Sequence, residues 1–139
     1  MSLSTEFDIT PDLVATAMTT AGDPLLDDLN AAQRAAVVFG EGPQLVLAGA
    51  GTGKTRVLTR RIAWLIASRR ARPSEILALT FTEKAAQEME ERVDRLVPFG
   101  FADTTIATFH AFGRRLLDEF GMLLGLPEGL RVQIGRAHV

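Results

Sequence analysis

The 139-residue sequence contains no cysteine and two histidines, His110 and His138. Disulfide bonds and thiolate metal sites are therefore excluded, and two histidines alone cannot form a zinc site. No apolar run approaches the ~20 residues that a membrane-spanning helix needs, and the N-terminus lacks the basic flank and apolar segment of a secretion signal. We therefore expect a cytoplasmic protein without a membrane partner.

Excess positive charge is also missing, because the formal net charge is −2 at pH 7. This balance argues against a protein that coats nucleic acid through bulk positive charge. Six arginines do fall between Arg56 and Arg72, and we expect most of them on a solvated helix face and the loop after it. With 47% hydrophobic residues, the chain has enough apolar side chains for one modest globular domain.

A glycine-rich segment follows the apolar run Leu45–Leu47. It reads Ala48-Gly49-Ala50-Gly51-Thr52-Gly53-Lys54-Thr55. The three glycines permit positive φ and leave backbone N–H groups uncovered, so that these amides can converge on an oxyanion at the start of the next helix. This is a phosphate loop of the Walker A type, in which Lys54 would reach the β- and γ-phosphates and the Thr55 hydroxyl would bind Mg²⁺. Ala48 stands where the strict pattern has glycine, and a glycine-rich turn that binds nothing is the alternative.

Hydrophobic periodicity predicts alternating helices and strands. Strands are predicted at Gln44–Leu47, Glu75–Phe81 and Thr104–Phe109. Helices are predicted near Pro11, from Asn30 to about Phe39, after the phosphate loop, after Thr82 and after Phe109. The last three carry apolar stripes at Leu58, Ile62 and Leu65, at Ala86, Met89, Val93 and Leu96, and at Phe112, Leu116, Phe120 and Leu123. This alternation implies an α/β fold with a parallel sheet and right-handed crossovers.

Charged residues on the predicted helices suggest two further interpretations. Glu88 with Arg92, and Glu91 with Arg95, have the spacing of i,i+4 ion pairs. Nucleotide hydrolysis by a phosphate-loop motor needs an acidic pair after a hydrophobic strand, and Asp118-Glu119 imitates such a pair. Its neighbours keep helical spacing, so an exposed position on a helix is favoured and the acidic motif is expected to be absent.

Four segments together resemble the UvrD/Rep/PcrA family of superfamily-one DNA helicases. They are Leu29-Asn30-Ala31-Ala32-Gln33-Arg34, the phosphate loop, Leu79-Thr80-Phe81-Thr82-Glu83-Lys84-Ala85-Ala86 and Ala107-Thr108-Phe109-His110-Ala111-Phe112. The resemblance covers roughly residues 29 to 125 and includes the order and spacing of the segments. It implies a partial RecA-like domain, truncated before the second half of the motor. It also implies ATP and Mg²⁺ as cofactors and single-stranded or partly duplex DNA as the partner, with translocation in the 3′ to 5′ direction.

The resemblance assigns a nucleotide site to Gln33, Ala48, Gly49, Ala50, Gly51, Thr52, Gly53, Lys54, Thr55 and Arg56, with Lys54 and Thr55 as catalytic residues. Gln33 is similar to the family's adenine-reading glutamine, which implies ATP rather than GTP. Arg56 is similar to the arginine that lies against the adenine face. The local pattern Asn30-x-x-Gln33 also fits a capping box, in which Gln33 folds back onto the Asn30 amide.

The resemblance also assigns DNA contacts to Thr80, Phe81, Thr82, Lys84, Thr108, Phe109 and His110. Both segments end predicted strands at the carboxyl edge of the sheet, where open α/β sheets bind ligands. Phe81 would stack on a base, an interaction worth about 1–3 kcal/mol, and the alternative is an ordinary core phenylalanine. The Thr108 hydroxyl can hold a phosphate at the start of a helix, and His110 is expected to cap or pack rather than to transfer protons. Glu83 stands where many members of the family have asparagine.

The sequence is therefore divided into three parts. Residues 1–28 are an N-terminal extension, residues 29–133 are the N-terminal part of a UvrD-like ATP-binding domain, and residues 134–139 resemble one reading frame of a sequencing adapter and are expected to be non-native. We expect a fragment of an ATP-dependent DNA helicase that is inactive by itself. Two alternatives stay open, namely another phosphate-loop protein of the kinase or switch type, and a fragment with no independent activity.

Overall fold

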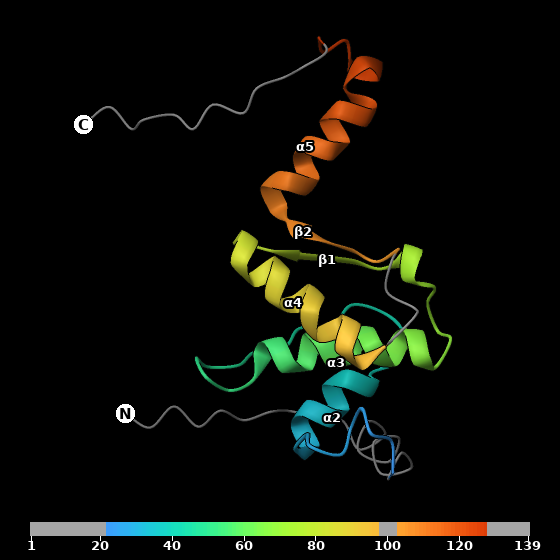
Figure 1. The fold of residues 1–139 in the computed structure, drawn as a ribbon, viewed down its shortest axis with the longest axis vertical. Helices are drawn as coiled ribbons and strands as arrows, with labels where there is room; N and C mark the ends of the chain where they lie inside the picture. Colours follow the sequence, from blue (N-terminus) through green and yellow to red (C-terminus); the bar gives the residue numbers. More distant parts are fainter. Residues whose placement is uncertain (1–21, 98–102, 128–139) are drawn as a thin grey trace, which may run out of the picture.

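A computed structural model describes residues 22–97 and 103–127 of the chain (Figure 1). The helix expected near Pro11 and the adapter-like tail at residues 134–139 lie outside the described residues. None of the described helices combines the length and the hydropathy that crossing a membrane would require.

Helices and strands alternate along the chain. The helices are α2 (Ala31–Val38), α3 (Lys54–Ala67), α4 (Glu83–Leu96) and α5 (Phe109–Phe120), and two 3-10 turns are η1 (Pro73–Glu75) and η2 (Gly121–Leu124). The strands are β1 (Leu77–Thr80) and β2 (Thr105–Thr108). They pair in parallel, with Leu77 opposite Thr105 and Thr80 opposite Thr108, so α4 forms the crossover between them. The expected α/β fold with a parallel sheet is confirmed for this strand pair.

Three of the helices begin at a residue whose side chain caps them. Asn30 Oδ1 accepts a hydrogen bond from the Gln33 amide at 2.9 Å at the start of α2. Thr82 and Thr108 do the same for α4 and α5, with donor–acceptor distances of 3.1 Å. Such a cap satisfies one of the free amides of the first turn. The predicted starts at Asn30 and Thr82 are confirmed, whereas α3 begins at Gly53 without a side-chain cap.

The core has two parts, and α3 contributes to both. Leu26, Val37 and Trp64 belong to the first part, which joins α2 to α3. The second part contains Ile62, Met89 and Val93 and packs α3 and α4 against the inner face of the strands. Figure 1 accordingly shows α3 between α2 and α4. The helix that follows the phosphate loop is therefore covered on two sides.

Arg61 on α3 ties this helix to the carboxyl end of α2. Its guanidinium donates to the backbone carbonyls of Val37 at 2.7 Å, of Phe39, and of Gly40 at 3.1 Å. Carbonyls at a helix end lack intrahelical donors, so these bonds satisfy them. Burial and the nearby charge of Arg70 lower the pKa of Arg61.

The predicted strand at Gln44–Leu47 is wrong. This segment makes no strand pairing with any described residue, and the Leu45 side chain is 82% exposed. An apolar run becomes a strand only where a neighbouring backbone supplies hydrogen-bond partners. The other two predicted strands are shorter than expected, because Glu75 lies in η1 and Phe81 and Phe109 follow the strands.

Side-chain positions on α3 and α4 differ from the prediction in one place each. On α3, Leu58 is exposed, because the buried faces are set by Val57, Ile62 and Trp64. On α4, the described residues show no ion pair for Arg92, and Arg95 Nε instead donates to the backbone carbonyl of Glu91 at 3.0 Å. Exposed i,i+4 pairs are worth only about 0.3–0.5 kcal/mol, so small competing interactions decide their geometry.

Helix α5 carries the predicted apolar side chains but buries none of them. Leu116 and Phe120 are exposed on α5, and Leu123 is exposed in η2. Asp118 also lies on α5, 3.7 Å from Arg114, and Glu119 is exposed beside it. The interpretation of Asp118-Glu119 as an exposed helical pair is confirmed.

The substitution Leu26→Ala tests the first part of the core. Leu26 is 0% exposed, so its truncation is expected to lower the free energy of unfolding by about 2–5 kcal/mol. Leu123→Ala is the matched control, because Leu123 is 83% exposed and its loss should change stability by less than about 0.5 kcal/mol. Urea unfolding followed by circular dichroism measures both, and equal effects would contradict the core described above.

Candidate functional site

The phosphate loop reaches α3 through two glycines in the left-handed region. Gly51 has φ 74° and Gly53 has φ 86°. The positive φ of Gly53 would strain any side chain there, and a Cβ atom would also lie 3.0 Å from Gln33 Nε2, so the Gln33 side chain would have to shift by a few tenths of an ångström. Because no side chain caps α3, the first amides of this helix and the positive end of its dipole are available to an anion.

Lys54 is held at the loop by two carbonyl groups. Its Nζ atom donates to the backbone oxygens of Ala48 and Gly49, both at 3.0 Å. Thr52 Oγ1 also donates to the Gly49 oxygen, at 2.6 Å. The Lys54 ammonium is therefore held by the first two residues of the predicted loop, and Lys54 stays exposed.

An open cavity of about 500 Å³ lies over the start of α3. It is lined by Gln33, Gly51, Thr52, Gly53, Lys54, Thr55, Arg56 and Arg92. Its volume is in the range of small-molecule sites. In the described parts of the chain, no group of three His, Cys, Asp or Glu side chains can hold a metal ion. The Thr55 hydroxyl fits Mg²⁺, because this ion takes oxygen ligands and usually keeps waters and phosphate oxygens in its shell.

Gln33 joins α2 to the phosphate loop. Its Oε1 atom accepts from the Asn30 amide at 3.1 Å, so the capping box is confirmed. Its Nε2 atom donates to the Thr52 carbonyl at 3.0 Å. The half-buried carboxamide thus lies at the edge of the cavity, and its reading of adenine stays a prediction. Arg56 is exposed beside it and donates to the backbone carbonyl of Asp28 at 3.4 Å.

Two phenylalanines come together where β1 and β2 end. Phe81 follows β1 and Phe109 follows β2, and their ring centroids lie 5.3 Å apart with an interplanar angle of 34°. Phe81 is 87% exposed, so the alternative of a core phenylalanine is wrong. Figure 1 shows the phosphate loop and these strand ends on the same side of the molecule.

The remaining predicted residues surround this aromatic pair. Thr80 ends β1 and is half-buried, while Lys84 and His110 are exposed in the first turns of α4 and α5. The Thr82 hydroxyl is used as the cap of α4. Thr108 is only 3% exposed, and its hydroxyl accepts from the Ala111 amide and donates to Glu83 Oε1 at 2.9 Å.

Sequence reasoning missed the positions of Glu83 and Arg92. Glu83 links the two strand-end segments through Thr108, and Arg92 reaches the cavity over α3 from α4. The register of β1 on β2 and the packing of α4 on α3 bring these residues to the site. No local pattern in the sequence could have found either of them.

Sequence comparisons with known proteins identify the family of this chain. The profile of the UvrD/REP helicase N-terminal domain matches residues 29–134. The chain is 50% identical over 100 residues to the ATP-dependent DNA helicase PcrA of Bacillus subtilis and 53% identical over 104 residues to the ATP-dependent DNA helicase UvrD1 of Mycobacterium leprae. It is 45% identical over 108 residues to DNA helicase II of Escherichia coli.

These matches cover 72%, 74% and 78% of this chain but 14%, 13% and 15% of the three relatives, so the chain spans a small part of their length. Gln33, the phosphate loop and both strand-end segments all lie within the matched residues. The chain therefore belongs to the UvrD/REP helicase family and represents part of its N-terminal domain.

Proposed function

We propose that this chain forms the nucleotide-binding face of an ATP-dependent DNA helicase that moves along single-stranded DNA in the 3′ to 5′ direction. The observation that carries the proposal is the uncapped start of α3, with Lys54 and Thr55 in its first turn. The relatives PcrA and UvrD1 are ATP-dependent DNA helicases. We therefore propose single-stranded or partly duplex DNA as the partner of this chain. Membership of this family argues against the kinase or switch-type alternative.

The triphosphate of ATP would bind at the positive end of α3. Backbone amides from Gly51 to Thr55 would donate hydrogen bonds to its oxygens. The Lys54 ammonium would leave the carbonyls of Ala48 and Gly49 and donate to the β- and γ-phosphates instead. Thr55 would contribute one oxygen to the Mg²⁺ shell, and the ion would neutralise part of the phosphate charge.

The adenine base would lie between Gln33 and Arg56. The Gln33 Nε2 group would leave the Thr52 carbonyl and donate to adenine N7, while Oε1 would accept from the N6 amino group. Guanine cannot form this pair of hydrogen bonds, because it carries an oxygen in place of the N6 amino group. The planar Arg56 guanidinium would stack on the base. Since Gln33 also bonds to the loop, we propose that adenine binding and loop geometry are coupled.

Single-stranded DNA would bind at the ends of β1 and β2. Phe81 and Phe109 offer exposed ring faces for stacking, which tolerates any base. Four polar residues next to these rings in the sequence would contact phosphates, namely Thr80, Thr82, Lys84 and His110. We assign Thr108 a positioning role, because its buried hydroxyl holds the start of α5 and the Glu83 carboxylate.

Hydrolysis of ATP needs an acidic pair, and no Asp or Glu is among the described residues that line the cavity over α3. Asp118 and Glu119 lie on α5, and neither of them lines the cavity over α3. We therefore expect the 139-residue chain to bind nucleotide weakly and to show no robust DNA-stimulated hydrolysis. Robust DNA-stimulated ATPase activity of the purified chain would contradict the expectation that the chain by itself is inactive.

The chain contains two lysines, one at each proposed site, and each serves as the control for the other. Lys54→Ala is expected to weaken ATP–Mg²⁺ binding about tenfold or more, because a charged hydrogen-bond donor is lost. Lys84→Ala removes the same charge and should leave ATP binding unchanged while weakening DNA binding. NMR titrations measure these low affinities. Equal losses of ATP affinity in both variants would show a general charge effect and contradict the proposal.

The substitution Gln33→Glu tests the adenine contact without removing the capping box. The carboxylate keeps an acceptor for the Asn30 amide but cannot donate to N7, so the preference for ATP over GTP should fall about tenfold. Competition titrations with both nucleotides give this ratio. Asn30→Ala is the control, since it removes the α2 cap and should leave the ratio unchanged. An unchanged ratio in Gln33→Glu would refute the adenine role.

Phe81→Ala and Phe109→Ala test the aromatic pair. Each is expected to weaken binding of single-stranded DNA by about 1–3 kcal/mol, to a similar extent for different base sequences. Fluorescence anisotropy with labelled oligonucleotides measures the affinity. Phe120→Ala on α5 is the control, because Phe120 is also exposed. A loss as large in Phe120→Ala would rule out a specific stacking site.

A further inference from the structure

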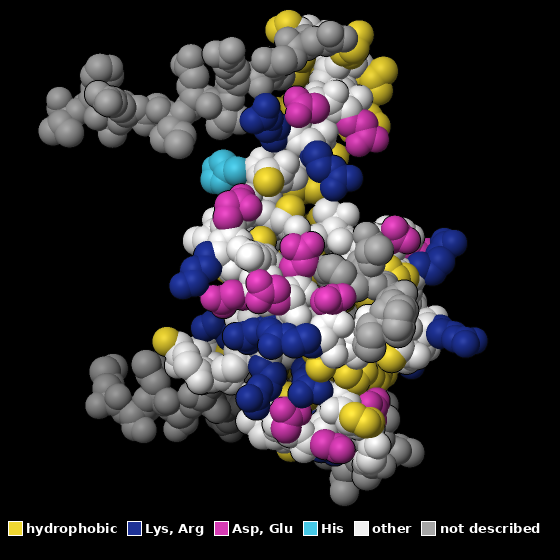
Figure 2. All heavy atoms as spheres, viewed as in Figure 1, with side chains coloured by type: hydrophobic (Ala, Val, Ile, Leu, Met, Phe, Trp, Pro, Cys, Tyr) yellow, Lys and Arg dark blue, Asp and Glu magenta, His cyan; other side chains and the backbone are white. Residues whose placement is uncertain are grey.

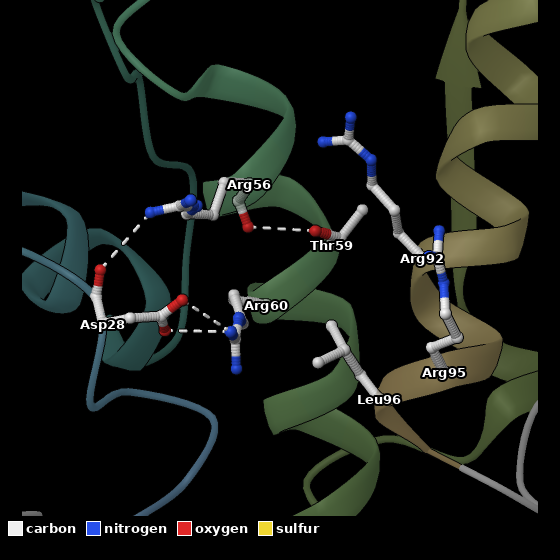
Figure 3. A pocket seen from close by; sticks show the side chains of 7 residues that line it. All are labelled: Asp28, Arg56, Thr59, Arg60, Arg92, Arg95 and Leu96. Atoms are coloured by element: carbon white, nitrogen blue, oxygen red, sulfur yellow. Dashed lines mark hydrogen bonds and ion pairs between the residues drawn. The ribbon is translucent and has the colours of Figure 1, made fainter.

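A second open cavity, of about 380 Å³, lies between α3 and α4 (Figure 3). Arg56 and Arg60 line it from α3, and Arg92 and Arg95 line it from α4. We call this space the arginine cavity. Asp28 is the one acidic residue among its lining residues. Figure 2 shows Lys and Arg side chains gathered in a band across this part of the molecule.

The single carboxylate is already used by one of the arginines. Arg60 donates to both Asp28 oxygens, at 2.9 and 3.0 Å, and also to the Pro24 carbonyl at 3.0 Å. Arg56 reaches only the backbone carbonyl of Asp28, at 3.4 Å. The charge of Asp28 therefore balances Arg60 and leaves the other three guanidinium groups without a carboxylate in the cavity.

Arg92 and Arg95 of α4 have guanidinium nitrogens that are available to a ligand. Arg95 uses Nε for the Glu91 carbonyl, which leaves its terminal nitrogens available. Arg92 makes no hydrogen bond or ion pair with any described residue, and Figure 3 shows its side chain extending from α4 toward α3. Planar guanidinium groups match the oxygens of phosphate with paired hydrogen bonds, and several like charges around one cavity raise the local potential for an anion.

We propose that the arginine cavity is a second anion site, distinct from the phosphate loop, that binds a small phosphate anion such as inorganic phosphate or pyrophosphate. The anion binds to Arg92 and Arg95 of α4. Arg56 of α3, whose guanidinium points toward the Asp28 carbonyl in Figure 3, would turn toward the anion on binding. The anion offsets the repulsion among these cations and fixes the end of α4 against α3.

The position of the cavity favours a small anion over the DNA backbone. Arg92 lies nine positions after Glu83, so its backbone is about 14 Å further along the axis of α4 than the start of the helix, which follows Phe81. A small anion satisfies the free arginines without requiring contact with the strand ends.

The two cavities share Arg56 and Arg92. An anion in the arginine cavity therefore changes the position of side chains that line the cavity over α3. If that cavity holds ATP as proposed above, occupation of the second site alters nucleotide affinity. This coupling rests on the proposed function, whereas binding of the anion itself does not.

The test is an NMR titration of the 139-residue chain with pyrophosphate, followed through backbone amides and arginine Nε–H resonances. Arg95→Gln is the main variant, because Arg95 lines the arginine cavity and not the cavity over α3. It is expected to weaken pyrophosphate binding about tenfold or more at this site. Lys54→Ala should leave this binding intact, and Arg114→Gln on α5 is the matched control for loss of one charge.

Several results would overturn the proposal. Pyrophosphate shifts confined to the phosphate loop and lost in Lys54→Ala would place the anion there alone. An equal weakening by Arg114→Gln would indicate diffuse attraction, and an absence of any shift in Arg92 and Arg95 would remove the site. Displacement of pyrophosphate by a single-stranded oligonucleotide would assign the arginines to DNA. Thermal melts verify folding. If Arg95→Gln lowers the melting temperature, Arg95→Lys repeats the test, because lysine keeps the charge at this site but loses the planar paired donors.

Discussion

Apolar packing on two sides of α3 fixes the positions of α2, α4 and the strands relative to one another. Val57 and Trp64 pack toward α2, and Ile62 packs toward α4 and the strands. Full burial of such a side chain is worth roughly 1.5–3 kcal/mol, so the helix axis is held by several independent contacts. Arg61 adds bonds to the end of α2. The direction of the phosphate loop follows, because the loop ends where α3 begins.

The start of α3 departs from the pattern of the other helices. Asn30, Thr82 and Thr108 each cap a helix, and such caps are worth about 1 kcal/mol. At Gly53 the chain forgoes this stabilisation and adopts a left-handed conformation. Strained or uncapped backbone of this kind is concentrated at functional sites. The backbone amides that no side chain caps there can donate hydrogen bonds to a ligand.

Parallel pairing of β1 and β2 creates the second functional region. Because Thr80 lies opposite Thr108, the residues that follow both strands emerge side by side at one edge of the sheet. The aromatic pair results directly from this register, and the bond from Thr108 to Glu83 fixes the start of α5 beside α4. The same packing of α4 on α3 brings Arg92 and Arg95 opposite Arg56 and creates the arginine cavity.

The sequence by itself determined the features that depend on neighbouring residues. Caps at Asn30 and Thr82 and the helix after the phosphate loop were predictable, because capping and periodicity act within a few residues. Three features follow from long-range packing and were not predictable: Gln44–Leu47 is no strand, Leu58 is exposed, and Glu83 accepts a hydrogen bond from Thr108. Strand pairing, the choice of buried helix face and contacts between distant side chains require partners from elsewhere in the chain, which a local pattern does not specify.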